Sequence, residues 1–329
     1  MASGRTRARS SLRKVPELAL LDHDTVLAAV SAAAAIDATR DAFLRHHSGE
    51  WVMPGKVYVE SPPYGDFRAM PARGGDLAVL KWVTSFPGNL AQGLPTVSGV
   101  VCLSDARTGV PLAILDARAV TALRTGAVAA VAALALARED ARSVGIVGCG
   151  LHGAWTARCL AAAGYAEGVC FDPRADAAAA LAQELGWSAG DLPAALACDI
   201  VNCITPGLAI VVERDDLRPG QHLNMLGADG SGKAEASIDA VVACDLFCDE
   251  WEQASHGGEL AAAVAAGRVT RDQVTALGAV LASEAPGRSG PDATTLFDST
   301  GLAIQDLAVA GAALHAARAG EIQARTITL

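Results

Sequence analysis

The chain has 329 residues, of which 51% are hydrophobic and 19% are charged, so it can bury a sizeable core and is not an intrinsically disordered protein. This length is typical of two domains. The net charge of −10 repels phosphate backbones and therefore argues against a nucleic-acid-binding protein.

We expect no signal that directs the chain out of the cytoplasm. A basic run near the N-terminus predicts a disordered tail, and no adequate apolar region of a secretory signal follows it (Arg5, Arg7, Arg9, Arg13 and Lys14). No segment has the roughly 18 uncharged apolar residues of a membrane span, and the longest candidate, residues 125–137, is expected to be a buried helix. The eight cysteines form no CxxC pair and no zinc-type cluster. We therefore expect reduced thiols, no metal site and a cytoplasmic protein.

The first part of the chain predicts a helix followed by an antiparallel sheet. Residues 24–47 have alanine-rich helical periodicity and open on Asp24. Short β-type runs follow, separated by proline- and glycine-rich turns, at 56–60, 66–70, 77–83, 96–103 and 110–115. A long alanine-rich helix is expected from about residue 117 to residue 137.

From residue 143 onward, predicted strands and helices alternate. The strands are expected at 143–147, 168–171, 200–204, 222–226 and 241–248, and helices at 151–163 and 174–185. This alternation predicts a parallel sheet that helices cover on both faces. A strand-like segment at 294–297 precedes a last helix at 301–317, which is a candidate to return to the first domain.

A glycine-rich segment directly after the strand at 143–147 is the first functional motif. It reads Gly148-Cys149-Gly150-Leu151-His152-Gly153 and fits the pattern G-x-G-x-x-G. The glycines permit a tight turn and a close approach of the backbone, and the helix that starts here offers unpaired N–H groups to a pyrophosphate. The strand–loop–helix context predicts a dinucleotide site formed by Gly148, Gly150, Leu151, His152 and Gly153.

Asp172 ends the next predicted strand, 24 residues after Gly148. A carboxylate at this point accepts hydrogen bonds from the adenosine ribose and repels a 2′-phosphate, which favours NAD. Arg174 weakens that inference, so NADP stays possible. The alternative, in which the glycines and Asp172 only form turns, leaves the order of these features unexplained.

Lys81 lies in an otherwise apolar strand. With a period of two it shares a face with Leu77, Val79 and Val83. Lysine is seldom buried without a partner. The pattern therefore fits two interpretations equally: a buried functional cation, or an edge strand whose lysine reaches water.

Two arginines are further candidate ligands for an anion. Arg124 lies in an apolar helix, where a buried guanidinium needs a planar two-oxygen anion. An internal salt bridge to Asp116 or Asp105 is its alternative. Arg68 shares a strand face with Asp66, so a local ion pair is the alternative for Arg68.

Asp229 follows the predicted strand at 222–226, at the edge of a parallel sheet where ligands bind. Capping the next helix is its alternative role. Lys233 lies near the expected start of that helix, where its charge opposes the helix dipole, and this hints at an anionic ligand.

The sequence as a whole resembles the ornithine cyclodeaminase/μ-crystallin family. The similarity covers about residues 50–310. It rests on several segments in the same order, which are Lys81-Trp82-Val83-Thr84-Ser85-Phe86-Pro87-Gly88-Asn89, Gly93-Leu94-Pro95-Thr96, Leu123-Arg124-Thr125-Gly126-Ala127, the glycine loop, Gly227-Ala228-Asp229 with Gly232-Lys233, and Phe297-Asp298-Ser299-Thr300-Gly301 with Asp306. The combination is far more specific than any one of these motifs.

The resemblance implies an α/β fold in which a Rossmann-type dinucleotide-binding domain is inserted in an α+β substrate and dimerisation domain. Residues 1–125, completed by 300–329, would form the substrate and dimer domain, and residues 126–299 the NAD(P)-binding domain. The resemblance also implies a homodimer.

The resemblance assigns roles to individual residues. Lys81 and Arg124 match the family's carboxylate-binding cations, and Asp229 matches its catalytic carboxylate, with Lys81 beside it in catalysis. Thr96 and Lys233 match positions near the nicotinamide and cofactor. Arg68 matches a dehydrogenase-like branch in which an arginine helps to hold the substrate carboxylate. Lys56 is a further candidate cation at the pocket edge.

Three functional hypotheses follow. The first is an NAD(P)-dependent oxidoreductase that transfers a hydride between nicotinamide and Cα of a small α-amino or imino acid. The second is an ornithine or lysine cyclodeaminase that uses NAD catalytically. The third is a non-catalytic NAD(P)H-binding protein, against which the set of Lys81, Arg124 and Asp229 argues. A pocket that contains Lys81, Arg124 and Arg68 is cationic and would disfavour the distal ammonium of ornithine.

Overall fold

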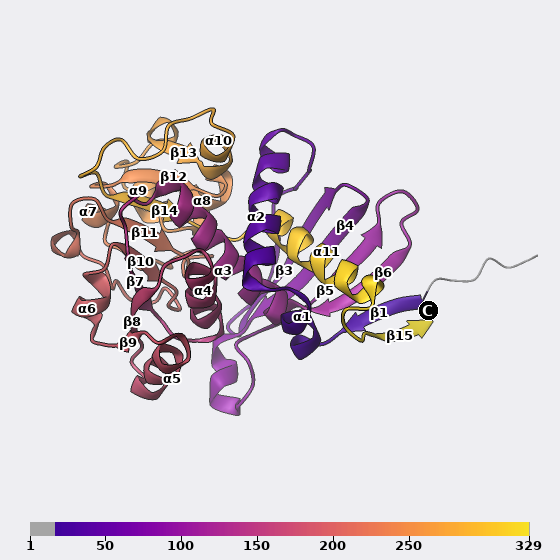
Figure 1. The fold of residues 1–329 in the computed structure, drawn as a ribbon. Coiled ribbons are helices and arrows are strands. Elements are labelled where there is room, and N and C mark those ends of the chain that lie inside the picture. Colours follow the sequence, from indigo (N-terminus) through magenta and orange to yellow (C-terminus); the bar gives the residue numbers. More distant parts are fainter. Residues whose placement is uncertain (1–16, 329) are drawn as a thin grey trace, which may run out of the picture.

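The structure is a computed structural model that describes residues 17–328. Its two sheets lie side by side, each with its own helices (Figure 1). The predicted fold class, a Rossmann-type unit inserted in an α+β unit, is confirmed. The basic N-terminal run and the tail expected there lie outside the described residues.

The first sheet has seven strands in the order β15-β1-β6-β5-β4-β3-β2. Strand β1 pairs with β6 in parallel, and the other neighbouring strands are antiparallel. The strands are β1 (Glu17–Leu21), β2 (Val57–Ser61), β3 (Gly65–Gly74), β4 (Leu77–Ser85), β5 (Val97–Asp105), β6 (Pro111–Asp116) and β15 (Arg325–Thr328). The five predicted strands are all present, whereas β1 and β15 were not predicted from the sequence.

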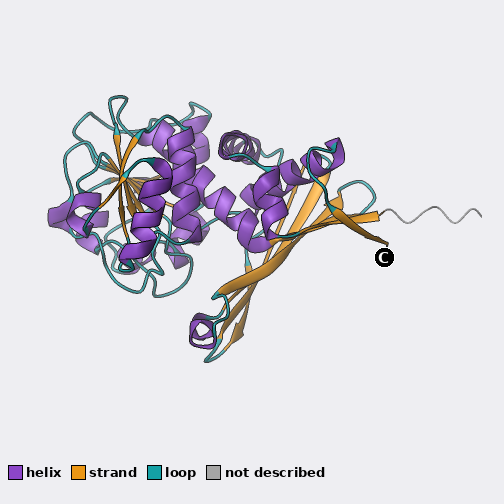
Figure 2. Ribbon diagram, turned by 60° about the horizontal axis from the view of Figure 1, so that its bottom comes forward, coloured by secondary structure: helices purple, strands orange, loops and turns teal. Residues whose placement is uncertain are grey.

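Helices cover one face of this sheet. They are α1 (His23–Ala29) and α11 (Ala303–Ala319), with α2 (Ala32–His47) packed on α11, and Figure 2 shows no described α-helix on the other face. The single helix expected at 24–47 is wrong. Val30 has an extended backbone, and the Ser31 side chain accepts a hydrogen bond from the backbone N–H of Ala34, which starts a second helix.

Helix α3 (Ala117–Leu136) lies between the two sheets (Figure 1). It is long and apolar enough to cross a membrane, but 83% of its most apolar window is buried inside the protein, as expected for a core helix. Gly126 allows α3 to approach α4 (Leu151–Ala162) closely, because a Cβ at this position would collide with the carbonyl of Trp155. The expected domain boundary between residues 125 and 126 falls within this helix.

The second sheet has eight strands in the order β13-β12-β14-β11-β10-β7-β8-β9, and all neighbouring strands are parallel. The strands are β7 (Ser143–Val147), β8 (Glu167–Phe171), β9 (Ser188–Ala189), β10 (Ile200–Cys203), β11 (His222–Met225), β12 (Asp245–Cys248), β13 (Val274–Ala276) and β14 (Thr295–Asp298). This is the parallel arrangement that the alternating pattern predicted.

The helices of the second unit are mostly short. Besides α4 they are α5 (Ala175–Leu185), α6 (Leu192–Leu196), α7 (Ile238–Val241), α8 (Trp251–Gly257), α9 (Ala261–Ala265) and α10 (Leu277–Leu281), with single 3₁₀ turns η1 (Pro87–Gln92), η2 (Arg214–Asp216) and η3 (Arg271–Gln273) elsewhere. The strand expected at 241–248 starts too early. The side chain of Ser237 caps α7, which ends at Val241, so β12 begins only at Asp245.

The bare face of the first sheet carries exposed apolar side chains. Val57 and Val59 of the edge strand β2 are exposed, and Leu80, Trp82 and Val100 continue the patch across β4 and β5. Alternation within β4 places Val79, Lys81 and Val83 on the covered face, where they are buried. We call Val57, Val59, Leu80, Trp82 and Val100 the outer apolar face.

Candidate active site

The glycine loop has the geometry of a dinucleotide cradle. Gly148 directly follows β7 and has a φ of +105°, and a Cβ there would lie 2.6 Å from the carbonyl oxygen of Ile204. A Cβ at Gly153 would collide with the carbonyl oxygen of Gly148. Gly150 precedes α4, and no side chain caps this helix. The N–H groups of Leu151 and its neighbours are therefore open to a phosphate.

Asp172 connects this loop to the end of β8. Its carboxylate accepts hydrogen bonds from the backbone N–H of Cys149 at 2.8 Å and from the side chain of Arg174 at 3.1 and 3.2 Å. Burial by itself would raise the pKa of Asp172, but these hydrogen bonds outweigh it and hold the pKa below its ordinary value. Both expected ribose-site residues therefore lie together beside the glycine loop.

Lys81 is a buried cation in a central strand, since β4 pairs with both β3 and β5. The edge-strand interpretation is therefore wrong. Its Nζ lies 2.8 Å from the Asp306 carboxylate and 3.4 Å from Oγ1 of Thr121. Burial lowers the pKa of Lys81 to about 8, the Asp306 charge opposes this effect, and the charge of Arg124 adds to it.

Arg124 approaches the same carboxylate. Its Nε lies 3.7 Å from Oδ1 of Asp306, within ion-pair distance but too long for a hydrogen bond. The alternative partners are occupied elsewhere, because Asp116 caps α3 and Asp105 binds the turn at 107–108. The guanidinium of Arg124 lies against Gly301, where a Cβ would come within 2.7 Å of its NH2 atom.

Arg68 combines the two roles that the sequence left open. Its Nε lies 2.6 Å from Asp66, as the local ion pair requires, and its NH1 lies 2.6 Å from Oδ2 of Asp229 in the second unit. Its guanidinium also lies over the ring of Tyr58, 5.4 Å from the centroid. The charge of Arg68 is therefore compensated by two carboxylates.

Asp229 lies between two cations. Besides Arg68, Nζ of Lys233 is 2.6 Å from its Oδ1 atom. Burial would raise the pKa of Asp229, but the charges of Arg68 and Lys233 outweigh it and hold the pKa well below its usual range. The helix-capping alternative is wrong, since Ser237 caps the next helix.

Two further basic side chains face this cluster. Nζ of Lys56 donates to the carbonyl oxygen of Thr300 at 2.7 Å, and burial lowers the pKa of Lys56 to about 8. His152, the second residue of α4, is close enough to Arg124 and Asp229 for their charges to act on it. Burial lowers the pKa of His152 to about 4, so its imidazole is neutral at physiological pH.

The side chain of Thr96 forms no hydrogen bond with any other described residue, so Thr96 is not connected to the other expected site residues. It lies half-buried before β5, and its carbonyl oxygen accepts from the backbone N–H of Phe86. The structure thus brings Arg68, Lys81, Arg124, Asp229 and Lys233 into one cluster. Asp172 and Arg174 form a separate cluster with the glycine loop.

Sequence reasoning assigned no role to several buried carboxylates around the site. Asp306 pairs with Lys81, and Asp249 accepts from the backbone N–H of Gly301 at 2.8 Å. Glu235 joins two loops by accepting from the N–H groups of Thr205 at 2.6 Å and Gly227 at 2.7 Å. The sequence did offer one signal for these carboxylates, namely acidic residues within apolar segments. Such residues are rarely buried without partners.

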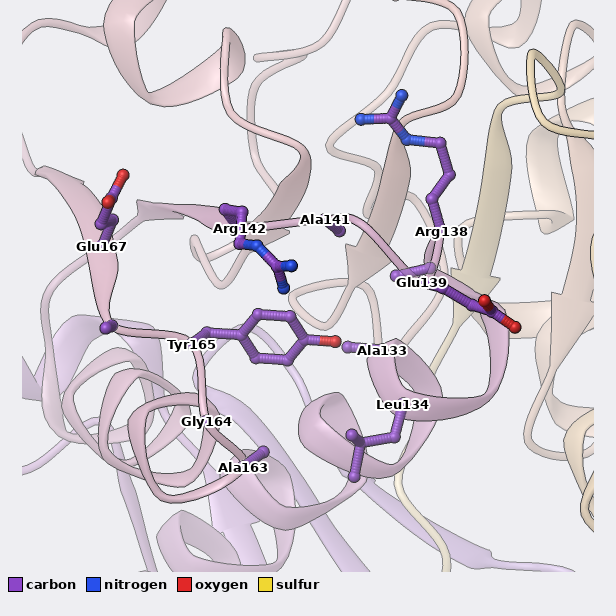
Figure 3. A pocket seen from close by; sticks show the side chains of 12 residues that line it. Ala133, Leu134, Arg138, Glu139, Ala141, Arg142, Ala163, Gly164, Tyr165 and Glu167 are labelled. Atoms are coloured by element: carbon purple, nitrogen blue, oxygen red, sulfur yellow. The ribbon is translucent and has the colours of Figure 1, made fainter.

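A separate cavity of about 400 Å³ lies at the C-terminal ends of α3 and α4 (Figure 3). In this view Arg142 and Tyr165 project into it from the loops that precede β7 and β8. None of the residues that line it belongs to the expected site.

Comparison with known sequences identifies relatives of two catalytic types. Alanine dehydrogenase of Archaeoglobus fulgidus is 40% identical over 301 residues, which are 89% of this chain and 93% of that protein. Ornithine cyclodeaminase of Agrobacterium tumefaciens is 31% identical over 253 residues, 74% of this chain and 69% of that protein.

Solved structures share the whole architecture. An archaeal alanine dehydrogenase dimer with bound NAD has a TM-score of 0.90 and 37% identity, with 95% of this chain and 99% of that chain covered. The Δ1-pyrroline-2-carboxylate reductase of Thermococcus litoralis, in complex with NADH and L-proline, has a TM-score of 0.89 and 26% identity, with 94% and 100% covered. The model of the ornithine cyclodeaminase/mu-crystallin family matches residues 17–321, and the chain belongs to this family, as the sequence resemblance predicted.

Proposed function

We propose that this chain is an NAD-dependent oxidoreductase that transfers a hydride between nicotinamide and Cα of a small α-amino or imino acid. The observation that carries the proposal is the guanidinium of Arg124. It forms no hydrogen bond with any described residue, although it is largely buried next to Lys81. A buried guanidinium without such a partner is suited to the carboxylate of a ligand.

The residues of the glycine loop fit a dinucleotide. Gly148 and Gly153 lack the Cβ atoms that would fill the cradle, and the start of α4 offers free N–H groups. Asp172 lies where it can accept hydrogen bonds from the ribose hydroxyls, which would replace those from Arg174. This arrangement favours NAD while leaving NADP possible. When bound there, the nicotinamide supplies the acceptor or donor of the hydride.

The cationic cluster would bind and orient the substrate. Arg124 and Lys81 would hold its carboxylate, and Arg68 would hold Asp229 in place from the opposite side. Positioning of this kind supplies a large part of catalysis. Asp229, at the edge of the cluster, would take or return a proton at the substrate nitrogen or at the attacking water. Lys81 and Asp229 are thus the catalytic residues that we propose.

A cyclodeaminase is the second candidate, since some relatives are named as ornithine cyclodeaminases. Such an enzyme must bind the distal ammonium of its substrate, which calls for an unpaired carboxylate. The carboxylates that contact the cations of the cluster are already paired: Asp66 and Asp229 with Arg68, and Asp306 with Lys81. We therefore favour a substrate with a short neutral or an acidic side chain. A non-catalytic binder would need no such set of paired charges.

The assembly and the division into domains are parts of the same proposal. No described helix covers the outer apolar face, which extends over three strands, and surfaces of this kind mark interfaces between proteins. A second copy of this chain would cover it and form a homodimer. We assign residues 1–125 and 300–329 to the substrate and dimer domain and residues 126–299 to the NAD-binding domain. The cytoplasm is the compartment that we infer for such an enzyme.

Cofactor preference tests the assignment of Asp172. The protein should bind NADH more tightly than NADPH, since the carboxylate repels a 2′-phosphate. Asp172→Asn should lose at least about tenfold in NADH affinity, because a charged hydrogen bond of this kind contributes roughly 1.5–3 kcal/mol. Nicotinamide fluorescence gives both dissociation constants. Tighter binding of NADPH by the unaltered protein would show that Arg174 governs the ribose site.

Asp229→Asn tests the proton-transfer role. We expect kcat to fall at least about 100-fold, the usual size of a lost general acid or base, while the affinity for NADH stays within about twofold. Asp239→Asn, which removes an exposed carboxylate that pairs with Arg268, is the matched control and should leave kcat unchanged. Turnover of Asp229→Asn within about threefold of the unaltered enzyme would make Asp229 structural.

Ornithine separates the two enzyme candidates. With catalytic NAD and ornithine, we expect little proline or ammonia, because the carboxylates that contact the cations of the cluster are already paired. With stoichiometric NAD and a short or acidic L-amino acid, NADH should accumulate. The measurements are proline, ammonia and absorbance of NADH. Rapid proline formation without net NADH would replace the dehydrogenase assignment by the cyclodeaminase one.

Light scattering tests the homodimer. The protein should be a dimer at micromolar concentration, and Trp82→Glu should shift it toward monomer, because the substitution places a charge in the middle of the outer apolar face. Leu134→Glu, which alters an exposed leucine on α3 away from this face, is the control and should stay dimeric. A monomeric unaltered protein would exclude the proposed interface.

A further inference from the structure

Asp306 is a fully buried carboxylate in the first turn of α11. It lies between two cations from distant parts of the chain. Nζ of Lys81 in β4 is 2.8 Å away, and Nε of Arg124 in α3 is 3.7 Å away. Three separate elements therefore meet at this one side chain.

Asp306 is the only anionic group among the described residues within ion-pair distance of Lys81. The other hydrogen-bond partner of the ammonium, Thr121, is neutral. Besides Asp306, the charges that act most strongly on Lys81 are those of Arg124 and Arg68, and Lys81 in turn acts on Lys56 and His152; all four groups are cationic or neutral. A buried ammonium among like charges loses its proton readily unless a carboxylate is next to it.

We propose that Asp306 is a positioning residue that keeps Lys81 protonated and fixes the spacing between Lys81 and Arg124 for a ligand carboxylate. This inference rests on the proposed function, since it assumes that the two cations bind a carboxylate. Asp306 itself is directed at the cations and has no exposed surface, so it acts on the ligand only through them.

The proposal has a pH-dependent consequence. The pKa of Lys81 is about 8, so its ammonium is charged below pH 8 and becomes neutral above it. Carboxylate affinity should therefore be constant at low pH and should fall as the pH rises through about 8. Removal of the negative charge of Asp306 lowers the pKa of Lys81 further, which moves the fall in affinity to lower pH.

The test is the binding of oxamate, an unreactive amide analogue of pyruvate, to the enzyme with NAD⁺, measured by calorimetry from pH 6 to pH 9. For the unaltered enzyme we expect a loss of affinity of up to tenfold per pH unit above about pH 8. For Asp306→Asn we expect the midpoint at least about one unit lower, so that the defect is small at pH 6 and large at pH 8. Asp199→Asn is the matched control, because it breaks a partly buried ion pair with Arg138 outside the site and should leave the midpoint unchanged.

A merely structural role gives a different result. If Asp306→Asn weakens oxamate binding equally at every pH, or if the unaltered enzyme shows no midpoint between pH 7 and pH 9, the proposal is overturned. If Asp306→Asn does not fold, Asp306→Glu decides. The Asp306→Glu variant keeps the negative charge, so its midpoint should stay unchanged although it binds oxamate more weakly. A midpoint one unit lower in this variant would contradict the proposal. Because oxamate binding requires no turnover, absence of dehydrogenase activity would refute the proposed function and leave this inference standing.

Discussion

The burial of the Lys81 ammonium in the middle of a sheet is the constraint on which the arrangement of the chain depends. A charge in that position needs a carboxylate, and none comes from the neighbouring strands. Asp306 supplies it from α11, which follows the last strand of the other sheet. The chain must therefore return across the molecule, and Figure 1 shows α11 lying against the first sheet. The turn before α11 also places Gly301 against Arg124 and the Thr300 carbonyl on Lys56.

Buried carboxylates also define the loops that carry Asp229. Glu235 links the loops after β10 and β11, and Glu259 in turn accepts from the backbone N–H groups of Glu235 and Ala236. Burial raises the pKa of Glu259 to about 8 and keeps that of Asp249 above its ordinary value. Burying these carboxylates costs free energy. The cost is offset because they accept hydrogen bonds from backbone N–H groups of irregular loops, which water cannot reach. Loops held in this way can position Asp229 against Arg68 from another unit.

The sequence predicted what depends on local pattern. The glycine loop, the parallel strands around it and the core position of α3 follow from period, turn chemistry and strand–loop–helix order. Pattern could not decide whether Lys81 lay at an edge, because this depends on β3 and β5 lying on either side of its strand. It also could not find Asp306 as the partner, 225 positions away. The break at Val30 and Ser31 was missed because the alanine-rich periodicity of residues 24–47 hides a local cap.

The charges around Asp229 define the chemistry that it can perform. A carboxylate bound to both Arg68 and Lys233 stays ionised over the physiological range, so it is in the state that can accept a proton. It is also a fixed negative charge beside the proposed reaction centre. Oxidation of an amine at Cα creates positive charge on the substrate nitrogen, and a preorganised carboxylate stabilises that charge without having to reorient. The ion pair with Arg68 joins the first sheet to the second, so the strength of Asp229 as a proton acceptor depends on how closely the two units approach.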